Sequence, residues 1–343
     1  SRVLVATDPE ATNIHVRIFG LQETFTPQTE EEYVDSLAVS LYNRMVSNRL
    51  EEAAKGEDPP FINGYYSRRP LVRSKDAVFW GAVAYEGETE GALRRLLIEE
   101  RRVDLFGFTE GELERAKKEL VSAVESAYEE REKTESSNFV RQYVRHFLTG
   151  EAAPGLEREW ELVREEVPGI TLETMERIHR DYMSSSHRVI IVTGPEKEGL
   201  SYPDEKRIDA LVEETGNAKV EPYSDDFEGT SLLPEKPEGG VVRDESFHEG
   251  GDFHSMILDN GARVVYKQTK LKNDQVLFSA FSEGGYSLVE TDDYYSAMLA
   301  TNFVDACGLG DFSPVDLEKL LAGTQAGISP YLQRYWEGFE GQA

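Results

Sequence analysis

The stretch from residue 258 to residue 302 constrains the fold of this chain more than any other. It contains Asn260-Gly261 between two apolar runs, and because Asn and Gly tolerate positive φ angles, this pair is typical of the turn in a β-hairpin. Gly284-Gly285 interrupts the pattern further on, before a segment with helical spacing and composition. The sequence predicts strands over 256–258, 263–267 and 276–281, followed by a helix over 295–306.

Two motifs in this stretch resemble the start of a repeat domain in the pitrilysin-like (M16) zinc metallopeptidases. One is L-x-N-G-x-x-V, which begins at Leu258, and the other is F-S-x-G-G-x-S, which begins at Phe281. Gly308-Leu309-Gly310 and Ser329-Pro330 fit the same repeat. The resemblance implies a longer parent protein that hydrolyses peptides with the help of Zn²⁺.

The residues that would bind zinc are replaced in this copy of the repeat. In the catalytic copy of the family, the helix after the loop carries H-x-x-E-H, in which two His bind Zn²⁺ and the Glu activates a water molecule. The resemblance places Met298 and Asn302 at the His positions and Thr301 at the Glu position. A thioether, an amide and a hydroxyl cannot replace these groups. We therefore predict a non-catalytic repeat without a metal ion, and expect Zn²⁺ only in the full-length parent.

The first part of the chain predicts a complete α+β unit. Short strands near the N-terminus are followed by a long helix with a Thr29/Glu32 capping box and by two strands over 61–67 and 77–85. A run of helices, one of which begins with a Thr109/Glu112 capping box, and a closing strand over 187–193 complete the unit. This order favours a mostly antiparallel sheet with helices packed on one face, which is the fold class that we predict for the chain. The resemblance implies the same fold.

The predicted organisation has three parts. Residues 1–196 form the complete repeat, 197–252 form an extended linker with one short helix over 204–214, and 253–343 form the first part of a second similar repeat. By resemblance these parts correspond to the second domain, the connection between the two halves, and the start of the third domain of an M16 peptidase. We expect the chain to be an internal piece of a longer protein.

The charge of the chain limits its partners. Asp and Glu number 65 against 37 Lys and Arg, which gives a net charge of −28. This charge argues against nucleic acid and against anionic membranes, and the sequence contains no apolar run long enough for membrane insertion. Dispersed acidity predicts adaptation to high salt, and attraction of a basic peptide substrate is the alternative explanation.

Two residues are weak candidates for substrate binding. In the family an Arg and a Tyr contact the substrate peptide beside the zinc, and Arg49 and Tyr65 are the nearest equivalents here. Their separation in sequence exceeds that of the family pattern, so the favoured prediction is a salt bridge at a helix end for Arg49 and a place in the sheet for Tyr65.

Other chemistry has little support in the sequence. His248 and His254 lie close together around Asp252, but the glycine-rich surroundings disfavour a metal site. The single Cys307 excludes an intramolecular disulfide, and we predict it to be a small buried helix residue.

The predicted function is therefore structural. The chain would be the non-catalytic central portion of an M16-like zinc endopeptidase, supplying chamber wall and hinge, and peptides or unfolded proteins would be the substrates of the full-length enzyme. A wholly non-catalytic scaffold or partner subunit of the same fold is the first alternative. An unrelated α+β peptide-binding domain is the second.

Overall fold

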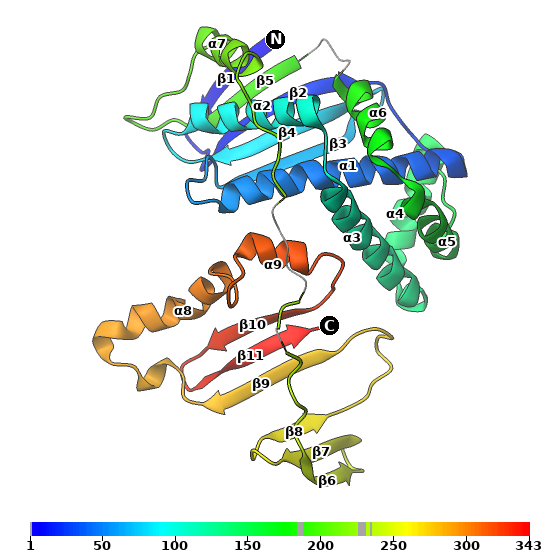
Figure 1. The fold of residues 1–343 in the computed structure, drawn as a ribbon, viewed down its shortest axis with the longest axis vertical. Helices are drawn as coiled ribbons and strands as arrows, with labels where there is room; N and C mark the ends of the chain where they lie inside the picture. The colour runs from blue at the N-terminus through cyan, green and yellow to red at the C-terminus, as the bar shows by residue number, and fades with distance from the viewer. Residues whose placement is uncertain (1, 184–187, 226–230, 234) are drawn as a thin grey trace. The chain divides into compact units, whose positions relative to one another are not determined.

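The computed structural model describes residues 2–183, 188–225, 231–233 and 235–343 (Figure 1). The chain divides into two compact units. The first comprises Ser1–Tyr128, Glu135–Phe227 and Gly308–Thr324, and the second comprises Glu129–Thr134, Glu228–Cys307 and Gln325–Ala343. No helix in the described ranges is both long and apolar enough to cross a membrane.

A five-stranded sheet forms the base of the first unit. Its strand order is β1-β5-β2-β4-β3, in which β1 pairs with β5 in parallel and the other three pairs are antiparallel. The strands are β1 (Arg2–Asp8), β2 (Ile14–Gln22), β3 (Asn63–Val72), β4 (Lys75–Ala84) and β5 (Arg188–Pro195). The prediction of a mostly antiparallel sheet in an α+β fold is confirmed. His187, the first residue of the predicted closing strand, lies outside the described residues.

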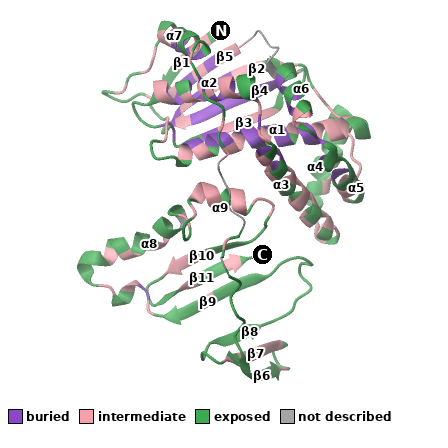
Figure 2. Cartoon of the chain, in the orientation of Figure 1, coloured by how far each residue is buried: buried purple, intermediate pink, exposed green. Residues whose placement is uncertain are grey.

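Helices cover one face of this sheet. Val16, Ile18 and Trp80 point to that face from alternate strand positions and are buried with the apolar stripes of α1 and α2 (Figure 2). The helices of the first unit are α1 (Glu30–Lys55), α2 (Thr89–Phe106), α3 (Glu110–Glu129), α4 (Ser136–Thr149), α5 (Leu156–Glu166), α6 (Leu172–Met183), α7 (Glu205–Gly216) and α9 (Pro314–Leu320).

The long helix α1 begins where the sequence predicts. The Thr29 hydroxyl accepts a hydrogen bond from the backbone N–H of Glu32, and the Glu32 carboxylate accepts one from the backbone N–H of Thr29. This capping box satisfies two of the backbone donors that every helix start leaves without a partner. Leu37, Leu41 and Met45 then follow at a spacing of four residues and are buried in the core.

The hairpin of β3 and β4 is longer than predicted. The connection is only Arg73-Ser74, because β3 continues through the charged residues Arg68 and Arg69 to Val72. Such polar residues gave no apolar pattern from which to predict a strand. Pro70 is tolerated because β3 is an edge strand, whose outward N–H groups need no partner in the sheet.

Two elements lie in the range predicted to be a linker. α7 is capped by the Asp204 carboxylate, which accepts a hydrogen bond from the Arg207 backbone, and it buries Ile208 and Leu211 in the core of the first unit. β6 (Val242–His248) pairs with the next strand of the second unit. Residues 242–248 of the predicted extended linker thus form a paired strand, which the charged and mostly exposed sequence of β6 did not indicate.

The described residues of the second unit form two three-stranded sheets and one α-helix. The orders are β6-β7-β8 and β10-β11-β9, and the predicted hairpin turn is confirmed, with Gly261 at φ 86° between β7 and β8. The predicted helix is confirmed as α8. The bounds are β7 (Phe253–Leu258), β8 (Arg263–Tyr266), β9 (Leu277–Glu283), α8 (Tyr294–Ala306), β10 (Gly327–Leu332) and β11 (Trp336–Gln342).

Gly285 shows why the loop before α8 is rich in glycine. Its φ is 74°, and a Cβ atom built on it would lie 2.1 Å from the backbone oxygen of Gln333. Any other residue would combine an unfavourable backbone conformation with a clash against main chain that has little freedom to move. The glycine loop is thus a packing requirement, independent of any catalytic role.

Core burial predicts that two leucines of α2 contribute very differently to the free energy of unfolding. Leu93 is completely buried, whereas Leu105 is 47% exposed. We expect Leu93→Ala to lower the free energy of unfolding by about 2–5 kcal/mol and Leu105→Ala to change it by less than about 0.5 kcal/mol. Urea unfolding of both variants measures this, and equal effects would contradict the assignment of the core.

Candidate functional site

The most elaborate polar arrangement in the first unit is centred on Arg49 of α1. Its side chain is only 2% exposed and forms two parallel hydrogen bonds with Glu112 of α3, from Nε to Oε1 at 2.6 Å and from Nη2 to Oε2 at 2.8 Å. Nη2 also donates to the backbone oxygen of Gly107 at 2.9 Å. Burial lowers the pKa of Arg49, but Glu112 outweighs this and holds the pKa above its ordinary value.

A second buried carboxylate extends this arrangement. Glu99 of α2 lies with its Oε1 3.5 Å from Arg49 Nη1 and also forms an ion pair with Arg102. Arg95 is a further cation at 3.8 Å. One carboxylate is therefore surrounded by three guanidinium groups, and burial lowers the pKa of Arg102 against the opposing charge of Glu99.

The chain after α7 covers the arginine. The ring of Tyr223 lies 4.5 Å from the guanidinium carbon of Arg49, and its hydroxyl donates to Glu52 Oε1 at 2.7 Å. Burial, with the charge of Glu52, raises the pKa of Tyr223. Lys319 of α9 donates to the Tyr223 hydroxyl at 2.9 Å and lies 3.1 Å from Glu52. Residues distant in sequence thus meet around Arg49.

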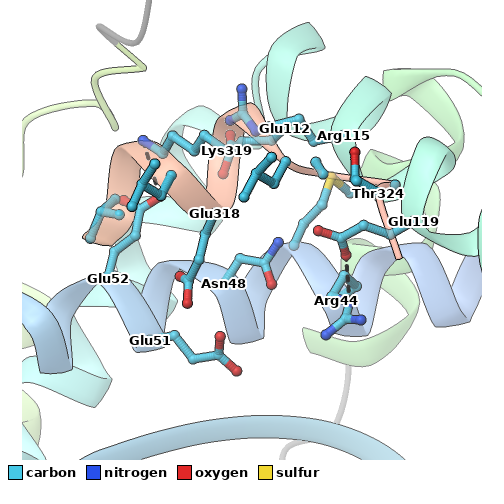
Figure 3. A pocket seen from close by; sticks show the side chains of 16 residues that line it. Arg44, Asn48, Glu51, Glu52, Glu112, Arg115, Glu119, Glu318, Lys319 and Thr324 are labelled. Atoms are coloured by element: carbon cyan, nitrogen blue, oxygen red, sulfur yellow. Dashed lines mark ion pairs between the residues drawn. The ribbon is translucent and has the colours of Figure 1, made fainter. Parts of the chain in front are cut away.

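A pocket of about 430 Å³ adjoins this cluster within the first unit. Its walls come from α1, α3 and the segment 315–324, and Figure 3 shows Asn48 and Glu51 of α1 facing the side that carries Glu318. Arg44 and Glu119 form an ion pair of 2.7 Å on one wall. Burial raises the pKa of Glu119, and the charge of Arg44 opposes the effect.

This pocket offers ionic and hydrogen-bonding contacts rather than reactive groups. Its described lining residues include acids, cations, an amide and a threonine hydroxyl, but no His, Cys or Ser. In the part of the chain that the structure describes, no three His, Cys, Asp or Glu side chains are placed to hold a metal ion. The arrangement can orient charged chain segments by complementary charge.

Comparison with known proteins shows which proteins this chain resembles. No family model matches the chain. A zinc protease described as PQQL-like from Arabidopsis thaliana is 26% identical over 309 residues, which covers 90% of this chain and 29% of the relative. The probable zinc protease PqqL of Haemophilus influenzae is 19% identical over 331 residues, covering 95% of this chain and 35% of the relative.

A solved structure shares the fold over the whole chain. The periplasmic protease PqqL from Escherichia coli matches with a TM-score of 0.60 and 17% identity, over 100% of this chain and 38% of that protein. These similarities confirm the predicted resemblance to the pitrilysin-like (M16) zinc proteases. It spans about a third of the length of these M16 relatives. The comparisons give no support to the predicted adaptation to high salt.

Arg49 and Tyr65, the two candidates for substrate binding, lie on opposite faces of the five-stranded sheet. Tyr66 points to the face of the sheet that α1 covers, so the adjacent Tyr65 points to the other face, where its ring lies against Gly81. Its hydroxyl lies 3.4 Å from Arg17 Nε. Arg49 lies on the α1 side and its side chain is committed to Glu112. A substrate role for either residue stays a prediction.

The residues at the M16 zinc positions lie on α8. Met298, Thr301 and Asn302 are three and four residues apart and share one face of the helix. Met298 and Asn302 are exposed and Thr301 is half-buried. Their assignment to the lost zinc positions stays a prediction that rests on the sequence motif.

The remaining candidates have structural partners or positions. His248 hydrogen-bonds Ser255 Oγ at 2.8 Å, and His254 stacks on Tyr266 with ring centroids 4.8 Å apart. Both therefore belong to the pairing of β6, β7 and β8. Cys307 is the exposed C-cap residue immediately after α8, so the prediction that it is a buried helix residue is wrong.

Sequence patterns located only part of this cluster. Glu112 was recognisable as the third residue of a capping box, and its Oε2 does accept a hydrogen bond from the Thr109 backbone at 2.8 Å. Its second role, as the buried partner of Arg49, has no local signal. Tyr223 lies in a stretch of linker-like composition, and nothing near it in sequence indicates that it contacts an arginine 174 positions earlier.

The cluster predicts that α1 tolerates loss of an exposed arginine but not of Arg49. Arg49→Ala leaves Glu112 buried without its cation and takes one of three cations from Glu99, and we expect a loss of about 3–5 kcal/mol in the free energy of unfolding. Arg44→Ala removes the half-exposed pair with Glu119 and should cost less than about 1 kcal/mol. Chemical denaturation of both variants measures the difference; equal losses would contradict a structural role for the buried pair.

His179 of α6 predicts a pH dependence of stability. Its Nδ1 lies 2.8 Å from the Tyr42 hydroxyl and its Nε2 lies 3.4 Å from Asp104. Burial lowers its pKa below the ordinary 6.5, against the opposing effect of Asp104. The unfolded chain therefore takes up the proton at a higher pH than the folded chain, so the stability that neutral His179 contributes is complete above 6.5 and is lost as the pH falls below it.

Comparison with a variant that cannot titrate isolates this effect. Between about pH 7.5 and about pH 5.5, the free energy of unfolding of the wild type should fall by more than that of His179→Asn. Parallel urea titrations at the two pH values provide the measurement. A variant with the same or a steeper loss would show that His179 does not cause the dependence.

Proposed function

We propose that this chain is a non-catalytic portion of an M16-type zinc protease, in which it supplies chamber wall and hinge. Residues outside the chain would hold Zn²⁺ and cleave peptides. Relationship to M16 zinc proteases supports the fold and the chemistry of the whole protein. The composition of α8 supports the non-catalytic role of this portion.

The observation that carries the proposal is the sequence of α8. This helix follows the hairpin and the glycine loop in the order that the catalytic M16 repeat uses, yet it presents Met298, Thr301 and Asn302. None of these side chains supplies the imidazole or carboxylate that zinc and its water require. The scaffold of the repeat is thus present while its chemistry is replaced.

The proposed domain organisation follows the M16 arrangement. Residues 1–196 would be the second domain, 197–252 the connection between the halves, and 253–343 the start of the third domain. The packing of α7 on the core of the first unit suggests that the connection is anchored before it becomes extended.

Peptides or unfolded proteins would be substrates of the whole enzyme. The FusC protease, similar to this chain with a TM-score of 0.59 and 18% identity over 100% of this chain and 38% of that protein, was solved in complex with Arabidopsis ferredoxin. A net charge of −28 would favour basic segments of a substrate over acidic ones. The sequence encoded before Ser1 distinguishes this proposal from a wholly non-catalytic scaffold, because only the protease needs an intact H-x-x-E-H there.

Zinc content tests the proposal. We expect the purified chain to contain less than about 0.1 zinc per molecule and to cleave no peptide, because α8 lacks zinc ligands. The triple variant Met298→His, Thr301→Glu, Asn302→His restores the motif on α8 and should bind zinc at least about tenfold more tightly than the wild type. Elemental analysis and equilibrium dialysis measure both.

Either of two results would contradict the proposed function. Stoichiometric zinc in the wild-type chain would overturn the non-catalytic role. A triple variant with no gain in zinc affinity would show that α8 does not occupy the position of the zinc helix.

A further inference from the structure

The helix α4 carries its apolar face on the outside of the first unit. Six apolar residues fall within one half of the helix circumference, and every polar residue after Ser137 falls within the other half. The five exposed ones, which we call the α4 stripe, are between 49% and 86% exposed: Val140, Tyr143, Val144, Phe147 and Leu148. Figure 2 shows α4 as exposed in this unit.

The contacts that α4 makes with the residues after it are polar, although most of its polar side chains are exposed as well. Gln142 donates to Glu159 of α5 at 3.1 Å, and His146 hydrogen-bonds the backbone oxygen of Glu151 at 2.6 Å. Arg145 pairs with Glu151 at 3.6 Å. An amphipathic helix normally turns its apolar half to the core, whereas the stripe of α4 is exposed, and an exposed apolar patch of this kind is typical of an interaction surface.

The charge of α4 narrows the chemistry of that partner. The helix contains Arg141 and Arg145 and no Asp or Glu, although the whole chain carries 65 acids and a net charge of −28. A complementary surface therefore has an apolar groove with acidic residues on its rim. Antiparallel pairing with a second α4 would set these arginines against the same arginines, which disfavours a second copy on the stripe.

The comparisons indicate where such a surface is found. About 65% of this chain matches the structure of the first half of PqqL from Escherichia coli, with a TM-score of 0.59 and 16% identity, and covers only 48% of that half. In that protein the matched region is thus accompanied by as much polypeptide again. A companion repeat in that additional polypeptide is the partner that we consider for the stripe.

We infer that the α4 stripe docks into an apolar, acid-rimmed groove on a companion M16-type repeat of the same longer polypeptide. This inference rests on the proposed function, because it requires the longer protein. The stripe is then an interface within one polypeptide, formed by Phe147 and Leu148 at its most exposed end and oriented by Arg141 and Arg145.

Hydrogen exchange of the complete gene product tests the docking. Amides of 136–149 should exchange at least about tenfold more slowly in the complete product than in the 343-residue chain, and Phe147→Ser should restore fast exchange in the complete product. The same substitution should leave the exchange of the 343-residue chain unchanged. Ile62→Ser, which changes an exposed apolar residue outside the stripe, is the matched control and should leave exchange of 136–149 slow.

Each other outcome overturns the inference. Equal exchange in the two proteins would show that nothing covers the stripe. Concentration-dependent dimerisation of the chain that Phe147→Ser abolishes would assign the stripe to a second copy. Binding to phosphatidylserine vesicles that the same substitution abolishes would assign it to a membrane surface.

The zinc content of the complete product keeps the two proposals separate. A product that binds zinc and cleaves casein but shows fast exchange over 136–149 contradicts the docking alone. A product without zinc that shows slow, Phe147-dependent exchange contradicts the proposed function alone. A gene that encodes nothing beyond these 343 residues contradicts both.

Discussion

The ion pair between Arg49 and Glu112 is the interaction on which the organisation of the first unit depends. Two charges that are almost completely buried are tolerated only because two short hydrogen bonds join them and a backbone oxygen accepts a third. Apolar burial would pack α1 against the sheet without this pair, but it would not position the chain after α7. The ring of Tyr223 packs over the guanidinium group of Arg49, and Lys319 donates a hydrogen bond to the Tyr223 hydroxyl.

In the proposed function, the second unit keeps the scaffold of the repeat without its chemistry. The hairpin turn at Gly261 and the close packing of Gly285 against Gln333 are requirements of the backbone, and they hold whatever side chains α8 presents. In the catalytic repeat of the family, in contrast, zinc binding and activation of the water depend on three side chains of one helix face, which can change without disturbing the fold. This separation explains how the family relationship and the residues of α8 can both be consistent with a structural role.

Sequence patterns predicted the elements whose causes are local. The capping boxes at Thr29 and Thr109 and the turn at Asn260-Gly261 involve residues within four positions of each other, and all three form as expected. β6 escaped prediction because its side chains are charged and exposed, and only its pairing with β7 makes it a strand. The contacts of Arg49 with Glu99, Glu112 and Tyr223 escaped prediction because they join residues that only the fold brings together.

The proposed function requires that the face of α8 has no part in catalysis. Replacing Met298, Thr301 and Asn302 by Ala in the complete gene product, and measuring zinc content and kcat/KM for peptide cleavage, tests this claim directly. If the α8 face is non-catalytic, zinc stays bound in this variant and kcat/KM stays within about twofold of the wild type. Loss of zinc, or a fall in kcat/KM of about a hundredfold or more, would contradict it.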